Sequence, residues 1–425
     1  MRVLLISPNR EEINMRTWPL GLACVAAATA KAGHDVRLLD LMESREPGEA
    51  LEKVIAELNP DVIGVSVRNI DDQTMRGTKF MLDEVKEVIS CCRTVSTAPV
   101  VLGGAGYSIF PEASLEYLAA DMGILGEGEA VFLELLKRLD EGSDLSGLPG
   151  LFLRSSGLQG ERSYVQDLDE LPLPDPPLFA HAPDDTNEEF WLPIQTRRGC
   201  PMNCSYCSTP AIEGRLFRKR SPEIVADWMG RWTKAGVRRF YFVDNTFNLP
   251  ASYAKELCSV IEAAQLDATW RCIVYPAKLD ETLVASMARA GCKEVSLGFE
   301  SGSEPILRWL NKRFKLDDVR HAARLFADVG IRRMGFLLLG APGETRDSVL
   351  ESLAFVDSLD LEAVKITIGI RIYPHTLLAK TAIEEGGVSS EDDLLSPRFY
   401  IAEGLEEWVY HTVSEWMAAR PNWMM

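Results

Sequence analysis

Short apolar runs alternate with amphipathic stretches along the first 140 residues. RVLLISP, HDVRLLDL, DVIGVSV, APVVLGG and DMGILG are rich in β-branched and other apolar residues, and helical patterns such as PLGLACVAAATAKAG and KFMLDEVKEVISCC separate them. Strands that are apolar throughout are buried on both faces, which is typical of a parallel sheet covered by helices. Residues 1–140 are therefore predicted to form an α/β domain with a doubly wound, Rossmann-like parallel sheet.

A second alternation follows a different kind of segment. Residues 141–190 contain GSDLSGLPG and LPLPDPPLF, which are rich in Pro, Gly and acidic residues and predict a linker or bridging segment. From residue 191, the strand patterns LPIQTRR, RRFYFVDN, TWRCIVYP, EVSLGFES, RRMGFLLLGAP and VKITIGIRIYP alternate with helical patterns. Six β/α units with right-handed crossovers predict a partial barrel over residues 191–385, with its functional loops after the carboxyl ends of the strands. Residues 386–425 are predicted to form a small, aromatic-rich helical segment.

Charge and hydropathy narrow the possible partners. The chain has 425 residues and a net charge of -18, which disfavours a surface that wraps nucleic acid or anionic lipid, and the short basic run RLFRKR does not change this. Its longest apolar stretches fall well short of the roughly 20 residues that a membrane-spanning helix needs. We expect a cytoplasmic monomer with no nucleic-acid partner and no membrane span.

The strongest chemical signal is RRGCPMNCSYCSTP, in the first loop of the predicted barrel. It places Cys200, Cys204 and Cys207 within eight residues, and neither a second CxxC nor a nearby His completes a four-ligand zinc site. Three thiolates leave one coordination position open, which favours an iron-sulfur cluster with one iron free, although zinc and no metal remain alternatives. The other six cysteines lie in apolar or amphipathic segments and are predicted to be core residues: Cys24, Cys91, Cys92, Cys258, Cys272 and Cys292.

CxxxCxxC after the first strand of a six-unit β/α barrel resembles the radical S-adenosylmethionine superfamily, over about residues 190–385. The resemblance implies a 4Fe-4S cluster on Cys200, Cys204 and Cys207, with S-adenosylmethionine chelating the fourth iron through its amino and carboxylate groups. It also implies that further motif residues bind this cofactor. These are Tyr206 beside the adenine, Asp244 and Asn245 at the methionyl amine, Glu300 and Ser301 at the methionine and ribose, Gly340 in a glycine-rich motif with Pro342 and Glu344, Arg371, and Tyr373 as a further catalytic residue.

Each of these motifs also has a purely structural interpretation. Asp244 and Asn245 are suitable as a helix N-cap, Glu300 as a solvated turn residue, and PGET as part of a capping box. Only their order behind the three cysteines makes the resemblance specific.

In the first domain, the loops after ISP, VSV, VLGG and LGEGE are expected to face one ligand. No GxGxxG follows the first strand, which argues against a nicotinamide dinucleotide. Residues 1–140 instead resemble the cobalamin-binding domain found in many radical S-adenosylmethionine proteins. The resemblance implies that cobalamin contacts lie among Ser7, Pro8, Asn9, Trp18, Ser66, Arg68, Asn69, Gly103, Gly104, Gly106, Gly126, Glu127 and Gly128.

One departure from the cobalamin-binding pattern is plain. The Asp-x-His-x-x-Gly motif that supplies an axial His to cobalt is absent, and His34 precedes the second strand, so we expect cobalt without a His ligand from the protein. Arg68 would then face the lower side of the corrin and favour four-coordinate Co(I), or it would form a surface ion pair with Asp71 or Asp72. Trp18 would pack on the ring edge or serve as a domain-interface aromatic.

Together the two resemblances imply a cobalamin-dependent (class B) radical S-adenosylmethionine enzyme, most simply a C-methyltransferase. In such enzymes cob(I)alamin takes a methyl group from one S-adenosylmethionine. A reductant such as ferredoxin or flavodoxin supplies the electron that cleaves a second molecule to the 5′-deoxyadenosyl radical. That radical removes hydrogen from an unactivated sp3 carbon, which then takes the methyl group.

The substrate is a small molecule or a protein residue. The specific expectation is methylation of a glutamine in methyl-coenzyme M reductase. The alternatives are a cobalamin-dependent cyclase or rearrangement enzyme acting on a small metabolite or lipid, and a non-catalytic cobalamin sensor.

Overall fold

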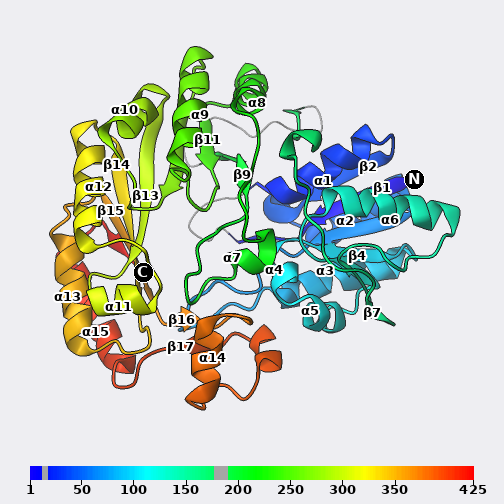
Figure 1. Cartoon of the computed structure of the whole chain (residues 1–425). Helices are drawn as coiled ribbons and strands as arrows, with labels where there is room; N and C mark the ends of the chain where they lie inside the picture. The colour runs from blue at the N-terminus through cyan, green and yellow to red at the C-terminus, as the bar shows by residue number, and fades with distance from the viewer. Residues whose placement is uncertain (12–17, 177–189) are drawn as a thin grey trace. The chain divides into compact units, whose positions relative to one another are not determined.

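The computed structural model describes residues 1–11, 18–176 and 190–425, and its chain divides into two compact units (Figure 1). The first unit comprises Met1–Asp72, Lys79–Phe190 and Thr209–Arg220. The second comprises Gln73–Thr78, Trp191–Ser208 and Ser221–Met425. Each unit therefore includes a short segment from the part of the sequence that mainly forms the other.

The first unit is built on a seven-stranded sheet of order β2-β1-β3-β4-β5-β6-β7. Its five parallel strands are β1 (Arg2–Ser7), β2 (Asp35–Asp40), β3 (Val62–Ser66), β4 (Val100–Gly103) and β5 (Met122–Ile124). Its longer helices are α1 (Leu20–Lys31), α2 (Pro47–Leu58), α3 (Leu82–Val95) and α6 (Glu129–Glu141). Helix α1 packs against α6 and α2 against α3, so the predicted doubly wound sheet is confirmed.

Two further strands come from the segment that was expected to be a linker. Strands β6 (Leu151–Leu153) and β7 (Gly157–Leu158) extend the sheet with antiparallel pairing, β6 beside β5. The sequence did not predict these strands, because each has only two or three residues, too few for a recognisable alternation of apolar and polar positions.

The second unit contains a parallel sheet of order β18-β15-β14-β13-β12-β11-β8. Its strands are β8 (Leu192–Ile194), β11 (Arg239–Phe242), β12 (Thr269–Val274), β13 (Cys292–Glu300), β14 (Arg332–Leu339), β15 (Ala363–Ile368) and β18 (Trp423–Met424). The helices between and after them are α8 (Pro222–Lys234), α9 (Ala251–Ala263), α10 (Glu281–Arg289), α11 (Glu304–Trp309), α12 (Leu316–Asp328), α13 (Arg346–Asp357), α14 (Leu377–Glu384) and α15 (Glu406–Ala418). The six predicted strands appear in sequence order, which confirms the partial barrel.

The C-terminal segment differs in part from its prediction as a helical segment. It contains α15, but β17 (Phe399–Tyr400) pairs with β16 (Ile370–Arg371), and β18 continues the main sheet beside β15. Trp423 is buried and its ring stacks on Trp416 at 6.1 Å. These aromatic residues are therefore packing residues of the second unit.

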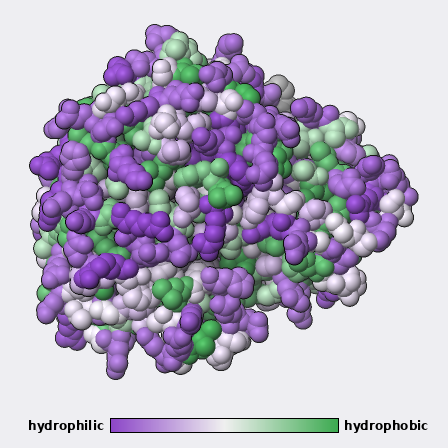
Figure 2. Space-filling view, viewed as in Figure 1, coloured by the Kyte–Doolittle hydropathy of each residue, from purple (hydrophilic) through white to green (hydrophobic). Residues whose placement is uncertain are grey.

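The surface in view is mainly polar. Figure 2 shows hydrophilic residues over most of the face in view, with hydrophobic residues in small, separate groups. Among the described residues, no helix combines the length and apolar character needed to cross a bilayer.

Candidate functional site

The three predicted iron ligands lie in one loop of the second unit, directly after β9 (Arg197–Arg198). Cys200 is buried, whereas Cys204 and Cys207 are half-buried. None of the three is part of a disulfide bond. The structure thus brings this part of the predicted site together in one short segment.

Backbone hydrogen bonds hold the middle of this loop. Ser205 N donates to Leu310 O at 3.2 Å, and Ser205 O accepts from Leu378 N at 2.9 Å. The loop is therefore fixed between the end of α11 and the start of α14. Such anchoring keeps the three thiols in place without using their sulfur atoms.

The donor set fits a 4Fe-4S cluster. Within the described ranges, no three His, Cys, Asp or Glu side chains are close enough to share one metal ion. A four-iron cluster takes each thiolate at a different iron and so does not need them to converge. Burial raises the pKa of the Cys204 thiol, whereas the nearby Lys312 lowers it; a bound iron would favour the thiolate form further.

A buried cation that the sequence analysis did not single out lies beside this loop. Lys312 Nζ donates to Glu300 Oε1 at 3.1 Å, and Tyr206 OH donates to the same oxygen at 3.1 Å. The Lys312 and Glu300 side chains are 6% and 15% exposed. Burial by itself would lower the pKa of Lys312, but the Glu300 carboxylate and Tyr206 hold this pKa well above its usual value. Lys312 is therefore a permanent positive charge next to Tyr206.

The sequence alone gives little indication that Glu300 and Lys312 form a buried ion pair. Glu300 ends β13 with a φ of 67°, a left-handed conformation that is uncommon for residues with a side chain. Lys312 follows a short helix, in LNKR, where a lysine is ordinarily assigned to the solvated surface. The interpretation of Glu300 as a solvated turn residue is wrong, because its carboxylate accepts these two hydrogen bonds.

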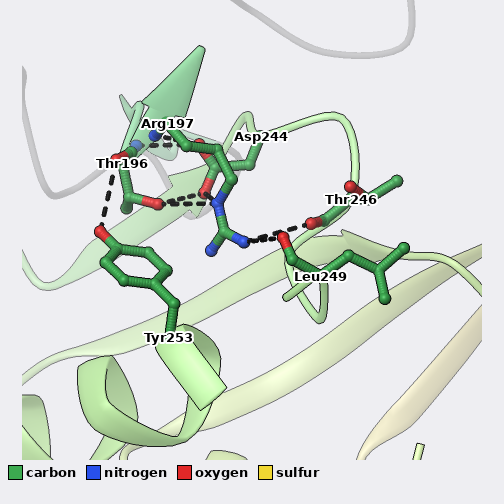
Figure 3. Close-up of polar contacts among 6 residues, drawn as sticks. All are labelled: Thr196, Arg197, Asp244, Thr246, Leu249 and Tyr253. Carbon is green, nitrogen blue, oxygen red and sulfur yellow. Dashed lines mark hydrogen bonds and ion pairs between the residues drawn. The ribbon is translucent and has the colours of Figure 1, made fainter. Parts of the chain in front are cut away.

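Asp244 lies at the carboxyl end of β11 and holds the chain that enters the cysteine loop (Figure 3). It is fully buried, and Oδ1 accepts from the backbone N of Thr196 at 2.8 Å and of Arg197 at 3.2 Å. Its Oδ2 accepts from Thr196 Oγ1 at 2.6 Å and lies 3.4 Å from Arg197 Nε. Both carboxylate oxygens are thus engaged within the second unit. Asn245 beside it is half-buried.

Arg197 is a second residue that the sequence analysis missed. Its side chain is 1% exposed, its Nη1 donates to the backbone O of Leu249 and Thr246, and its guanidinium lies 4.7 Å from the centre of the Tyr253 ring (Figure 3). A buried arginine held by carbonyls, an acid and an aromatic ring stabilises one loop conformation. Its signal was its place in RRGC, three residues before the first ligand.

Ser301 is also engaged by protein groups. It is fully buried, its Oγ lies 3.1 Å from Ser352 Oγ, and it accepts from Ser303 N at 3.1 Å. These contacts fix the turn after β13.

The glycine-rich motif after β14 folds back on itself. Gly340 has a φ of 111°, and its N–H and that of Ala341 donate to Glu344 Oε2 at 2.5 and 3.0 Å. Burial raises the pKa of Glu344 to about 7. The neighbouring capping box involves Thr345 and Ser348 rather than Glu344, so the Glu344 carboxyl stabilises the turn itself.

Arg371 holds the C-terminal segment of the second unit. It is buried, Nη1 donates to Ile372 O at 2.7 Å, and Nη2 donates to Leu394 O at 2.8 Å. Its guanidinium lies 5.2 Å from the centre of the Tyr373 ring. The roles expected for Arg371 and Tyr373 at the cofactor remain predictions.

In the first unit, the predicted cobalamin residues gather at the carboxyl ends of β1, β3, β4 and β5. Gly104 has a φ of 102°, and a Cβ on it would lie 2.6 Å from Val67 O. Gly106 N donates to Val67 O at 3.0 Å and to Arg68 O at 2.9 Å. Glycine at both positions lets the loops after β3 and β4 approach closely.

The loop after β5 joins the same edge. Gly126 N donates to Ser108 Oγ at 2.9 Å, and a Cβ on Gly126 would lie 2.8 Å from Arg162 Cδ. A Cβ on Gly128 would lie 3.2 Å from Val25 Cγ2 in α1. These two glycines therefore make room for protein side chains.

The remaining candidates differ in exposure. Ser7 and Pro8 are buried, Arg68 is exposed, and the half-buried residues are Asn9, Trp18, Ser66, Asn69, Gly103 and Glu127. His34 lies at the amino end of β2, where its Nδ1 is 3.3 Å from the N-terminal nitrogen of Met1. It is thus at the opposite edge of the sheet from the predicted cobalamin loops.

Comparisons with known proteins agree with the cysteine loop of the second unit and with the predicted cobalamin loops of the first unit. The Radical SAM superfamily profile matches residues 194–356, and the B12 binding domain profile matches residues 7–136. An uncharacterized methyltransferase of Pyrococcus horikoshii is 28% identical over 90% of this chain and 83% of its own length. An anaerobic magnesium-protoporphyrin IX monomethyl ester cyclase of Rubrivivax gelatinosus is 26% identical over 83% of this chain and 65% of its own length.

A solved structure is similar over the whole chain. The radical S-adenosylmethionine methyltransferase TsrM from Kitasatospora setae, with cobalamin and a 4Fe-4S cluster bound, has a TM-score of 0.88 and 24% identity. The match covers 100% of this chain and 90% of that one. At this identity the likeness shows that the two proteins share their fold.

Proposed function

The chain belongs to the radical SAM superfamily and carries a B12-binding domain, and from this premise we propose that it methylates an unactivated sp3 carbon in a cobalamin-dependent reaction. The observation that carries the proposal is the anchored three-thiol loop beside the buried Glu300–Lys312 pair. The related methyltransferase from Pyrococcus horikoshii supports the methyl-transfer assignment.

The cofactors would be held by residues of both units. Cys200, Cys204 and Cys207 would ligate the cluster, Tyr206 and the Glu300–Lys312 pair would receive S-adenosylmethionine, and the glycine loops of the first unit would receive cobalamin. When bound, the cluster supplies the electron that cleaves S-adenosylmethionine, and cobalamin carries the methyl group. A one-electron reductant such as ferredoxin or flavodoxin is therefore part of the proposal.

The protein's own contribution is orientation. Asp244 and Arg197 fix the strand end that enters the cysteine loop, and Lys312 would donate a hydrogen bond to the carboxylate of S-adenosylmethionine. Charge-assisted hydrogen bonds of this kind are directional and short. Precise placement keeps a radical intermediate away from water and from side reactions.

Isotope transfer tests the proposal. The reconstituted enzyme is incubated without oxygen with a reductant, S-adenosylmethionine carrying a deuterated methyl group, and candidate substrates, and the products are identified by mass spectrometry. A substrate that gains one labelled methyl group, with 5′-deoxyadenosine and S-adenosylhomocysteine formed in similar amounts, supports the proposal. The Cys204→Ala variant serves as the control and should form none of these products.

The related cyclase from Rubrivivax gelatinosus supports one alternative, a cobalamin-dependent cyclisation or rearrangement. Such a reaction would produce 5′-deoxyadenosine without S-adenosylhomocysteine. The product ratio in the same experiment therefore separates the two functions.

The specific substrate proposal is the α-carbon of a glutamine in methyl-coenzyme M reductase. It is supported only by the fact that this reaction has the same chemistry. Mass spectrometry of the corresponding glutamine peptide, incubated as above, tests it directly.

A further inference from the structure

Lys365 lies on the inner, concave face of the barrel in the second unit. Along β15 the side chains of Val364, Ile366 and Ile368 are buried, whereas Ala363, Lys365 and Thr367 between them are half-buried. In the register of the sheet Lys365 lies beside Phe336 of β14. The alternate residues of β14 face the outer helices, since Arg333 of that strand donates to Ala323 O in α12. Lys365 and Phe336 therefore share the inner face.

The Lys365 ammonium has no partner among the residues that the structure describes. No hydrogen bond or ion pair joins it to any of them, and burial lowers its pKa without an opposing contribution from a nearby acid. A half-buried cation without an anion is costly in a folded protein. Lysines in such positions usually extend their charged head to water, and an acidic ligand that reaches this head can form a charge-assisted hydrogen bond with it.

The register also places Lys365 close to the cofactor end of the barrel. Glu300 lies beside Leu337, and Leu337 lies beside Ile366. Lys365 is thus two strands away from Glu300 and one residue nearer the amino end of its strand. From the spacing of strands, the Cα atoms of Lys365 and Glu300 are roughly 10 Å apart. Glu300 itself is neutralised by Lys312, so it leaves the charge of Lys365 uncompensated.

Other charges on the inner face do not supply the missing anion. Arg271 and Arg332 lie 3.8 and 3.9 Å from the carboxylate of Glu294, which they share. Arg271 also lies between the rings of Trp191 and Tyr241, at 4.6 and 4.8 Å. Arg271, Arg332 and Glu294 lie near the amino ends of their strands. Together they have two positive charges and one negative charge, so they offer no spare anion to Lys365.

From this geometry we infer that the substrate carries an acidic group, a carboxylate or a phosphate, and that Lys365 binds this group inside the barrel. The inference rests on the proposed function, because it assigns the inner face to a substrate. It rests on the cobalamin-dependent methyl transfer alone and competes with the specific glutamine substrate, since a neutral glutamine side chain has no group that needs Lys365.

Chemical protection tests the site. The cofactor-loaded enzyme, saturated with S-adenosylmethionine, is acetylated with an N-hydroxysuccinimide ester, and labelling of Lys365 is measured by peptide mass spectrometry. Acetate or inorganic phosphate should slow the labelling of Lys365 about threefold or more, whereas neutral acetamide should not. Exposed Lys293 is the control lysine and should label at the same rate throughout. Equal labelling of Lys365 with and without both anions overturns the inference. The stronger of the two anions identifies the acidic group.

Variants provide a second measurement that does not depend on the reactivity of Lys365. Binding of inorganic phosphate, followed by phosphorus NMR line width, should weaken about tenfold in Lys365→Met and recover in Lys365→Arg. Unchanged phosphate binding in Lys365→Met overturns the inference. S-adenosylmethionine affinity should be the same in all three proteins, and a loss in Lys365→Met would assign the lysine to that cofactor instead. Neither assay requires methyl transfer. A failure of the proposed function would appear in the isotope-transfer experiment, and a failure of this inference would appear in these two assays.

Discussion

Arg218 and Glu127 form a buried ion pair inside the first unit, with side chains 6% and 7% exposed. Arg218 Nη1 donates to Glu127 Oε1 and to Val165 O, and the other oxygen of Glu127 accepts from Val165 N at 2.9 Å. Arg218 Nη2 donates to Glu213 O at 2.7 Å. Because Glu127 belongs to the GEGE loop, the pair ties a predicted cobalamin loop to the segment Thr209–Arg220 that follows the cysteines.

Replacing Arg218 by Met should destabilise the first unit. The change leaves the Glu127 carboxylate buried without its cation, which typically costs roughly 3–5 kcal/mol in the free energy of unfolding. Chemical unfolding of the cofactor-free protein measures this loss, and cobalamin binding should weaken with it. Arg93→Met is a matched control, since Arg93 and its partner Asp121 are each 40% exposed, and it should cost less than about 1 kcal/mol. Equal losses in the two variants would contradict the structural role of the buried pair.

The pair also shows where sequence-based prediction stops. Apolar runs predicted the parallel strands of both sheets, because burial on two faces leaves a local pattern. Arg218 was part of a basic run, RLFRKR, and only the fold brings it to Glu127, 91 residues away. The same applies to Lys312, whose role depends on a strand end and a loop far apart in sequence. The cysteine loop was found because its ligands are neighbours along the chain.

Replacing Cys204 by Ala should remove one ligand of the proposed cluster. We expect iron content after anaerobic reconstitution to fall severalfold and cleavage of S-adenosylmethionine to be lost, because a cluster on two thiolates is poorly held. Cys258→Ala is the control, since Cys258 is buried in α9 outside the loop, and it should retain its iron. Full iron content in Cys204→Ala would show that the cluster assignment is wrong.

Replacing Lys312 by Met should separate cluster binding from cofactor binding. Iron content should stay normal, because Lys312 is not a ligand, while affinity for S-adenosylmethionine falls about tenfold through loss of a charge-assisted hydrogen bond. Titration calorimetry or substrate-free formation of 5′-deoxyadenosine measures the effect, and Lys312→Arg should restore part of it. Lys255→Met, which breaks an exposed pair with Asp280, should leave affinity unchanged. Loss of iron in Lys312→Met would instead point to a role in folding the loop.

Glu344 should make the stability of the second unit depend on pH near neutrality. Burial raises its pKa from 4.5 to about 7, so the folded state favours the protonated carboxyl. The resulting stabilisation is complete below the ordinary pKa and is lost as the pH rises through about 7, a change of about 3 kcal/mol at most. Glu344→Gln keeps an oxygen for the N–H groups of Gly340 and Ala341 but does not titrate. Between about pH 5 and about pH 8, urea unfolding should therefore show a steeper loss of stability in the natural protein than in this variant. Glu351→Gln, at an exposed position of α13, should keep the natural slope, and an equally steep slope in Glu344→Gln would assign the pH dependence to other groups.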